Sequence, residues 1–434
     1  MGQRGRAELT RIPLGRAHML ASSIIREARR AGIGVDAITA VGSLRRFAPD
    51  IGDVTLLGVV PVSGHSQVLK AFTRLALVLE VTAKSSSSVT ADTARGPITL
   101  HLTPPEQAGA ALVWHTGARA HIDQLQARAG RLGLQFARGT VSRTTGPAVS
   151  CASEEALYGT LDLPLIAPEL RGGDGEIDAA ERGELPRLVS DLHIRGDLHT
   201  HSTWSDGGNT IADMVSAAKQ LGYDYLAITD HSERAWSSRT LAASDVSKQR
   251  DEIEAIRARV RGIDVLHGVE VDIMQDGRLD FDDDVLGGFD IVLASLHDPG
   301  DDDAARLNTR YLRAIRHPLV NVITHPTNRA PGRSNGYALD FDRLFAAAAE
   351  TGTAMEVDGA PGHLDMDGHV ARRAAAAGVT IVIDSDCHRV EALGRQMQFG
   401  VGTARRGWIE PRHVLNTRGV GDVRAFVARK RTRG

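Results

Sequence analysis

Nine histidine, aspartate and glutamate residues in the C-terminal half of this 434-residue chain have the types and spacing of metal ligands. They are His199, His201, Asp206, His231, Glu270, His297, His325, Asp386 and His388. Imidazole and carboxylate donors without a cysteine pair are typical of Zn, Mn or Fe sites. Nine ligands are too many for one tetrahedral site, so the sequence predicts two or three divalent ions. Ions about 4 Å apart activate water and stabilise a leaving oxygen, which suits phosphate esters.

Each motif alone is weak. An isolated His-x-His is more often an accident of the surface or the core than a ligand pair, and Glu270 could cap a helix or pair with an arginine. The nine residues together are harder to explain without metal. Crowded carboxylates repel one another and must take up protons unless a cation is present.

The elements that must position these residues alternate between short apolar strands and amphipathic helices. Strands are expected at residues 194–198, 225–229, 265–273, 291–296, 320–324, 354–357 and 379–383. Helices are expected at residues 211–221, 246–260, 304–315, 341–350 and 370–377. This alternation predicts seven parallel strands with helical crossovers, in a closed or nearly closed barrel. The carboxyl ends of such strands form one functional face, and six of the seven units bring ligands to it. Because residues i and i+2 of a strand face the same side, His199 with His201, and Asp386 with His388, can reach one point.

The N-terminal part reads as a smaller α/β unit. We expect a helix at 11–32, strands at 38–41, 54–60, 77–82 and 98–102, and helical structure at 108–132. An acidic stretch interrupted by glycine and proline follows, and it reads as a connector or degenerate subdomain. The expected domains are therefore 1–135, 136–193 and 194–434.

Bulk properties exclude several classes of protein. The net charge is -3, so there is no global basic field for nonspecific duplex binding. The two cysteines, Cys151 and Cys387, predict no disulfide framework, and we expect Cys387 to pack in the core. No apolar run reaches the roughly 20 residues of a membrane span, and the first residues lack a signal-peptide core, so we expect a cytoplasmic protein without membrane contact.

The motifs around the nine residues resemble those of the PHP (polymerase and histidinol phosphatase) domain. That family carries nine metal ligands on a distorted seven-stranded barrel. The resemblance implies that His199, His201, Glu270 and Asp386 surround one ion and, with His388, form the catalytic core. It implies that Glu270 bridges to a second ion near His297 and His388. Asp206, His231 and His325 would then hold a third ion.

A wider resemblance covers nearly the whole chain. Residues 42–46 (Gly-Ser-Leu-Arg-Arg) and 52–57 resemble the palm motif of bacterial family X DNA polymerases. Residues 104–106 and 116–117 resemble the region between palm and thumb, and residues 168–171 with 175–177 resemble the stretch before the PHP domain. The chain therefore looks like a family X polymerase in which the N-terminal lyase-like and helix-hairpin-helix segments have no room before Arg11.

Departures from this pattern bear on function. The family uses three palm carboxylates to hold two Mg²⁺ ions. In this chain Asp53 corresponds to the first of these carboxylates, but threonines, Thr55 and Thr99, correspond to the second and third. We therefore expect a degenerate polymerase site. Ser43, Arg45 and Arg46 could still contact phosphate, or the arginines could simply be solvated. Near the fourth PHP motif, Asp358 and His363 replace Asn and Arg, which weakens the case for DNA.

Three functions remain open from the sequence. The leading one is a Mn²⁺-dependent 3'-5' exonuclease or 3'-end-processing phosphoesterase acting on DNA in repair. The second is a phosphatase acting on a small phosphomonoester, as histidinol phosphatases do, and the third is a noncatalytic DNA-repair scaffold. The sequence nominates no general acid: His363 and Asp298 fall near the expected mouth, but we expect both to be solvated loop residues.

Overall fold

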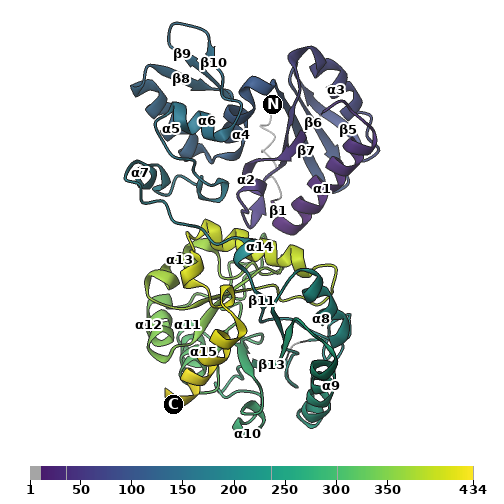
Figure 1. Ribbon diagram of the computed structural model, residues 1–434, viewed down its shortest axis with the longest axis vertical. Helices are drawn as coiled ribbons and strands as arrows, with labels where there is room; N and C mark the ends of the chain where they lie inside the picture. Colours follow the sequence, from purple (N-terminus) through teal and green to yellow (C-terminus); the bar gives the residue numbers. More distant parts are fainter. Residues whose placement is uncertain (1–10, 36, 236, 301, 434) are drawn as a thin grey trace, which may run out of the picture. The chain divides into compact units, whose positions relative to one another are not determined.

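The computed structural model describes residues 11–35, 37–235, 237–300 and 302–433. The chain divides into two compact units, residues 1–185 and 186–434 (Figure 1). Within the described ranges, no helix is both long enough and apolar enough to cross a membrane.

The first unit begins with a five-stranded mixed sheet in the order β2-β4-β7-β6-β5. Its strands are β2 (Ala37–Ala40), β4 (Val54–Val59), β5 (Glu80–Lys84), β6 (Ser88–Thr93) and β7 (Gly96–Thr103), while β1 (Ile12–Pro13) pairs separately with β3 (Asp50–Ile51). The accompanying helices are α1 (Leu14–Arg30), α2 (Gly42–Arg45) and α3 (His65–Phe72). Helix α1 forms because apolar residues recur at helical spacing: Leu14, Leu20, Ile24 and Ala28 are all buried. The predicted helix and three of the four predicted strands lie close to where we expected them. The strand expected at 77–82 begins later, at Glu80, and β6 was not predicted.

The rest of this unit adds detail to the expected elements. The helical structure expected at 108–132 consists of two helices, α4 (Ala108–Thr116) and α5 (Arg119–Arg131), separated at Gly117 and Ala118. The stretch after it is ordered structure with its own buried residues, among them Leu157 and Tyr158. It contains β8 (Leu134–Ala137), β9 (Thr140–Arg143), β10 (Ala148–Val149), α6 (Glu154–Thr160) and α7 (Glu176–Glu181).

An ion-pair network connects α2, which lies beside the five-stranded sheet, with the later segment of this unit that contains α6. Both oxygens of Glu154 accept hydrogen bonds of 2.7 Å from the Arg45 guanidinium. Glu154 Oε1 also accepts one of 2.6 Å from Arg171, whose side chain is fully buried. Arg46 donates to the main-chain oxygen of Thr116. The alternative of simply solvated arginines is therefore wrong for Arg45, whose guanidinium is held by Glu154.

The second unit confirms the expected distorted seven-stranded barrel. Its strands are all parallel and follow the chain order: β11 (Gly196–Asp197), β12 (Tyr225–Ile228), β13 (Asp264–Asp272), β14 (Ile291–Ser295), β15 (Val322–Ile323), β16 (Ala354–Asp358) and β17 (Ile381–Asp384). An isolated bridge between Thr200 and Cys387 joins the extensions of the first and last strands, so the barrel nearly closes. Cys387 is fully buried in the apolar core, as its sequence position suggested.

Helices surround this barrel and cover one of its ends. They are α8 (Ile211–Gln220), α9 (Val246–Arg259), α10 (Asp283–Leu286), α11 (Ala304–Arg316), α12 (Phe341–Thr351), α13 (Gly368–Ala376), α14 (Leu393–Arg406) and α15 (Val420–Arg433). The sequence reading missed α10, α14 and α15. Val423, Phe426 and Val427 of α15 pack in one cluster with Tyr225 and Ala354, which begin their strands. Helix α15 therefore covers the amino ends of these strands, and the carboxyl ends are left to form a site.

Candidate metal centre

The barrel brings all nine predicted ligand residues to the carboxyl ends of its strands. Glu270 lies near the end of β13, and the other eight follow β11, β12, β14, β15 and β17. His325 and Asp386 have positive φ angles of 25° and 48°. Such backbone conformations cost about 1–3 kcal/mol in residues other than glycine and tend to occur at functional sites. Two of the nine candidate ligands therefore have a backbone conformation of this kind.

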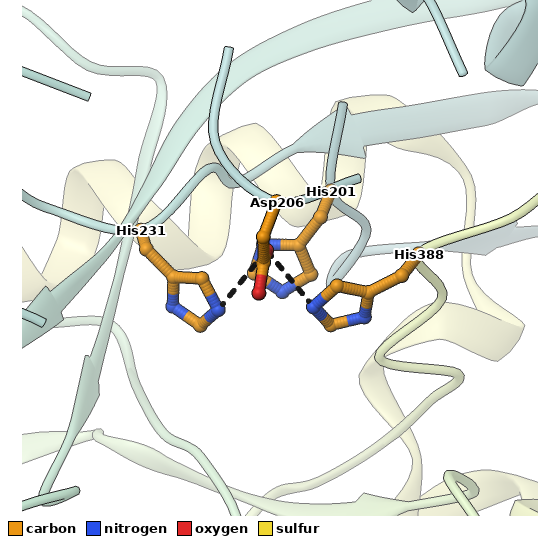
Figure 2. A group of neighbouring side chains, drawn as sticks. All are labelled: His201, Asp206, His231 and His388. Atoms are coloured by element: carbon orange, nitrogen blue, oxygen red, sulfur yellow. Dashed lines mark ion pairs between the residues drawn. The ribbon is translucent and has the colours of Figure 1, made fainter. Parts of the chain in front are cut away.

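The first group consists of His201, Asp206, His231 and His388, and Figure 2 shows the four side chains turned toward one another. One ligand atom from each lies within 4.8 Å of the others. Asp206 Oδ1 lies 3.2 Å from His388 Nε2 and 3.6 Å from His231 Nε2. Three imidazoles and one carboxylate at this spacing can hold one divalent ion.

The second group contains His199, His201 and Asp386. Asp386 Oδ1 lies 3.1 Å from His201 Nε2 and 3.6 Å from His199 Nε2. Glu270 Oε2 reaches the same place, 3.4 Å from His199 Nε2 and 3.6 Å from His201 Nε2. These contacts agree with the expected first ion.

The third group contains His231, Glu270 and His297. His231 Nδ1 lies 2.7 Å from Glu270 Oε2. Glu270 Oε1 lies 2.9 Å from His325 Nε2 and 3.5 Å from His297 Nε2. These side-chain contacts differ from the expected division of ligands. His325 lies beside Glu270 and His297, whereas His388 lies beside Asp206 and in one group with His231.

Unpartnered buried atoms test whether these residues fit a metal cluster. Seven potential ligand atoms are buried and form no hydrogen bond among the described residues, although several lie within ion-pairing distance of one another. They are His199 Nε2, His201 Nδ1, His201 Nε2, Asp206 Oδ1, His231 Nδ1, Glu270 Oε2 and His325 Nδ1. A buried polar atom left in this state costs about 1–3 kcal/mol. Divalent ions would satisfy several of them at once, so the donor set fits two or three such ions.

In the metal-free protein, the charges of the candidate ligands act on one another. Burial opposes ionisation of Glu270, but the surrounding His231, His199 and His297 outweigh it and hold the pKa of Glu270 well below its usual value. Burial likewise opposes a charge on His325, yet Glu270 raises the pKa of His325 to about 9. In the protein alone, protonated imidazoles thus balance the carboxylates, and metal binding would release these protons.

The sequence reading missed a layer of carboxylates that hold the ligands in place. Glu356, in the one strand to which no ligand was assigned, is fully buried and accepts a 2.7 Å hydrogen bond from His199 Nδ1. Its other oxygen accepts a 2.7 Å bond from the main-chain nitrogen of His325. Asp272 lies 3.2 Å from His297 Nδ1. The one available signal was alternation: Asp272 lies two residues after Glu270 and so faces the same side of β13.

Glu356 contacts both His199 and His325, so its replacement is expected to weaken metal binding. We expect Glu356→Gln to weaken metal binding by about 10–100-fold, the usual effect of losing a carboxylate that orients a ligating histidine. Titration of the metal-free protein with Mn²⁺ measures this, and excess Mn²⁺ should restore much of the activity. Glu350→Gln, at an exposed position on α12, is the control. Equal affinities in the two variants would contradict a positioning role for Glu356.

His363 and Asp298 were both expected to be solvated loop residues, and the structure places them differently. The His363 ring stacks on that of His325 with centroids 5.1 Å apart, and its Nδ1 is buried without a described partner. Burial, together with His325, lowers the pKa of His363 to about 4. The solvated-loop expectation is therefore wrong for His363, which lies beside the centre as a neutral imidazole. Asp298 is half-buried and accepts from Gln275 and from the Gly300 main chain.

The predicted polymerase site lies in the first unit and has a single carboxylate among its three key positions. Thr55 on β4 pairs in register with Thr99 on β7. Thr55 Oγ1 donates a 2.8 Å hydrogen bond to Asp53 Oδ2, and Thr99 Oγ1 lies 3.0 Å from Thr90 Oγ1. The side chains of Thr55 and Thr99 are therefore neutral hydroxyls held by hydrogen-bond contacts.

Two family models match the chain. The PHP domain model matches residues 197–355, within the barrel. The DNA polymerase beta thumb model matches residues 111–172, in the first unit. PHP domains bind several divalent metal ions, in agreement with the three ligand groups described above.

Curated relatives extend these matches. The chain is 34% identical over 433 residues to the DNA polymerase/3'-5' exonuclease PolX of Bacillus subtilis (strain 168), covering 99% of this chain and 75% of the relative. It is 31% identical over 208 residues to a probable phosphatase of Shewanella oneidensis, covering 46% of this chain and 78% of the relative. It is 28% identical over 246 residues to a probable phosphatase of Thermoanaerobacter sp. (strain X514), covering 54% of this chain and 95% of the relative.

Proposed function

Because this chain belongs to the family X DNA polymerases that carry a PHP domain, we propose that it is a metal-dependent 3'-5' exonuclease or 3'-end-processing phosphoesterase acting on DNA. The coarser part of this statement, a hydrolase acting on phosphate esters, is common to the PolX relative and the phosphatase relatives. The finer part, DNA as the substrate, follows the near full-length similarity to PolX.

One observation carries the proposal: eight of the nine potential ligands fall in three groups that share His201 and His231, and the ninth, His325, lies 2.9 Å from Glu270. Two or three bound divalent ions would lower the pKa of water and neutralise charge on a phosphate. The chain's own residues hold the geometry. Glu270 spans two groups through its two oxygens, while Glu356 and Asp272 fix the orientation of His199 and His297.

We further propose that polymerase activity has been lost. A nucleotide triphosphate needs two Mg²⁺ ions held by carboxylates, and Thr55 and Thr99 leave Asp53 as the one acid at the three positions. The guanidinium of Arg45 is engaged by Glu154, which leaves it less free to meet a triphosphate. The expected result is no primer extension above background.

The test is the degradation of a short 5'-labelled oligodeoxynucleotide by the Mn²⁺-loaded full chain. We expect shortening from the 3' end, and we expect Asp386→Asn purified in parallel to be inactive, which excludes a contaminating nuclease. Intact DNA at high concentrations of metal-loaded enzyme would refute the proposal.

A phosphatase acting on small phosphomonoesters is the second candidate. Its specific support is the similarity of about half of the chain to two probable phosphatases, together with His363, which stacks on His325 beside the centre. A panel of phosphorylated metabolites distinguishes the two functions. Faster turnover of a monoester than of any DNA end would favour the phosphatase.

A further inference from the structure

A glycine loop lies against the first ligand group. Gly207 and Gly208 directly follow Asp206, and the main-chain nitrogen of Gly208 donates a 2.7 Å hydrogen bond to the oxygen of His388. A Cβ added at Gly207 would lie 2.6 Å from the Ser202 oxygen and 2.7 Å from the carbonyl carbon of His201. The loop is thus pressed against the strand end that carries His201, and a side chain at Gly207 could not be accommodated without displacing the main chain.

Two exposed arginines approach this loop from different parts of the barrel. Arg239, in the segment between β12 and α9, donates a 3.2 Å hydrogen bond from Nη2 to the Gly207 oxygen. Arg389 follows His388, and its Cγ and Nε atoms lie 3.3 and 3.6 Å from the position of a Cβ at Gly208. Both guanidinium-bearing side chains therefore lie beside the Asp206–His388 edge of the metal centre.

Arg239 and Arg389 differ from several other arginines of the barrel in their ion pairing. Arg234, Arg278 and Arg329 each pair with an aspartate, at 3.6, 2.6 and 3.1 Å. Within the described part of the chain, no carboxylate lies within ion-pairing distance of Arg239 or Arg389. Guanidinium groups have planar donor geometry that matches phosphate oxygens. Two unpaired guanidiniums beside a phosphoesterase centre are therefore available to a second anionic group of the substrate.

We propose that Arg239 and Arg389 bind an internucleotide phosphate next to the one held at the metal centre, and so select polynucleotides over single phosphate esters. This inference rests on the proposed function, because it assumes that the metal centre holds the reacting phosphate. A small phosphomonoester has no second phosphate to engage the pair. The arginines would accordingly contribute to DNA cleavage much more than to the hydrolysis of a small ester.

The test compares two substrates in the same Mn²⁺-loaded full-length protein: an oligodeoxynucleotide and bis(p-nitrophenyl) phosphate, a diester with one phosphate. We expect the double variant Arg239→Ala/Arg389→Ala to lower the ratio of kcat/KM for the oligonucleotide to that for the small diester at least tenfold. Arg239→Lys/Arg389→Lys should restore part of the loss, because it keeps the charge. Arg261→Ala is the control, since Arg261 is exposed before the amino end of β13 and donates only to main-chain oxygens of its own turn.

A binding measurement tests the pair independently of cleavage. We expect the affinity for a fluorescent phosphorothioate oligonucleotide to depend less on salt in the double alanine variant, with a slope of log K against log salt smaller by about 0.7 per lost contact. An unchanged slope and an unchanged substrate ratio would overturn the role of the arginines. An equal loss on both substrates would also overturn it, because it would indicate a general disturbance of the centre. Failure of the wild type to cut DNA would count against the proposed function, and the salt slope would still decide the arginine pair.

Discussion

Replacing Glu270 with glutamine is expected to lower kcat/KM of the Mn²⁺-supplied enzyme by about three orders of magnitude and to reduce the metal bound per chain. Glu270 reaches His199 and His201 through one oxygen and His297 and His325 through the other. An amide keeps the shape of the side chain but removes the negative charge and one of the two oxygen ligands. Metal ions supply several kcal/mol of charge stabilisation in such reactions, and each 1.36 kcal/mol is a tenfold change in rate.

Metal analysis and steady-state kinetics on the same preparations check this prediction. Glu254→Gln is the matched control, since Glu254 is an exposed residue of α9 that pairs with Arg257. We expect this control to keep wild-type metal content and activity. A Glu270→Gln protein with full metal content and more than a tenth of wild-type activity would show that Glu270 does not bridge the ligand groups.

The positions of the candidate ligands could be predicted from the sequence because two local rules determine them. Alternation of strand and helix patterns identified the seven units, and the carboxyl ends of parallel strands must lie on one face. His199 and His201 follow β11, and Asp386 and His388 follow β17, as the strand pattern required. Neither rule depends on contacts between distant residues.

The grouping of ligands depends on barrel closure, which local patterns do not describe. The bridge between Thr200 and Cys387 places the end of β17 beside the end of β11, so His388 meets Asp206. Strand β15 lies beside β14, so His325 meets the Glu270–His297 side instead. Glu356 was missed for a related reason: it lies inside a buried apolar strand, and only its contact with His199 shows its role.

The long-range ion pair between Arg45 and Glu154 in the first unit could not be predicted from the sequence either. Arg45 and Glu154 are 109 residues apart, and nothing in the acidic, glycine-interrupted stretch around Glu154 suggested a buried partner. That stretch appeared to lack a core because its apolar residues follow no single period. Its order depends instead on packing of α4 against α6 and on the charges that Glu154 brings together.

Replacing Glu154 with glutamine is expected to destabilise the first unit by about 3–5 kcal/mol, the cost of removing one partner from a buried ion pair. The variant leaves the buried guanidinium of Arg171 and the partly buried one of Arg45 without their shared carboxylate. Glu155→Gln is the matched control, because Glu155 is the exposed neighbour on the same first turn of α6. Unfolding transitions followed by calorimetry measure the difference, and equal shifts in the two variants would contradict the internal role of Glu154.

The pH dependence of this prediction has a definite sign. Burial opposes the charge on Glu154, but hydrogen bonds from Arg45 and Arg171 outweigh it and hold the pKa of Glu154 below its usual value. A carboxyl group with a lowered pKa in the folded state stabilises the protein above its unfolded pKa, about 4.3, and loses this contribution as the pH falls through the folded value. The difference in unfolding free energy between wild type and Glu154→Gln should therefore be largest near neutral pH and should decrease below about pH 4.

Removal of metal by a chelator should instead lower the unfolding temperature of the barrel, since all three ligand groups lie in that unit. Two results would contradict these expectations: a chelator that shifts only the unfolding of the first unit, or a destabilisation by Glu154→Gln that increases in acid.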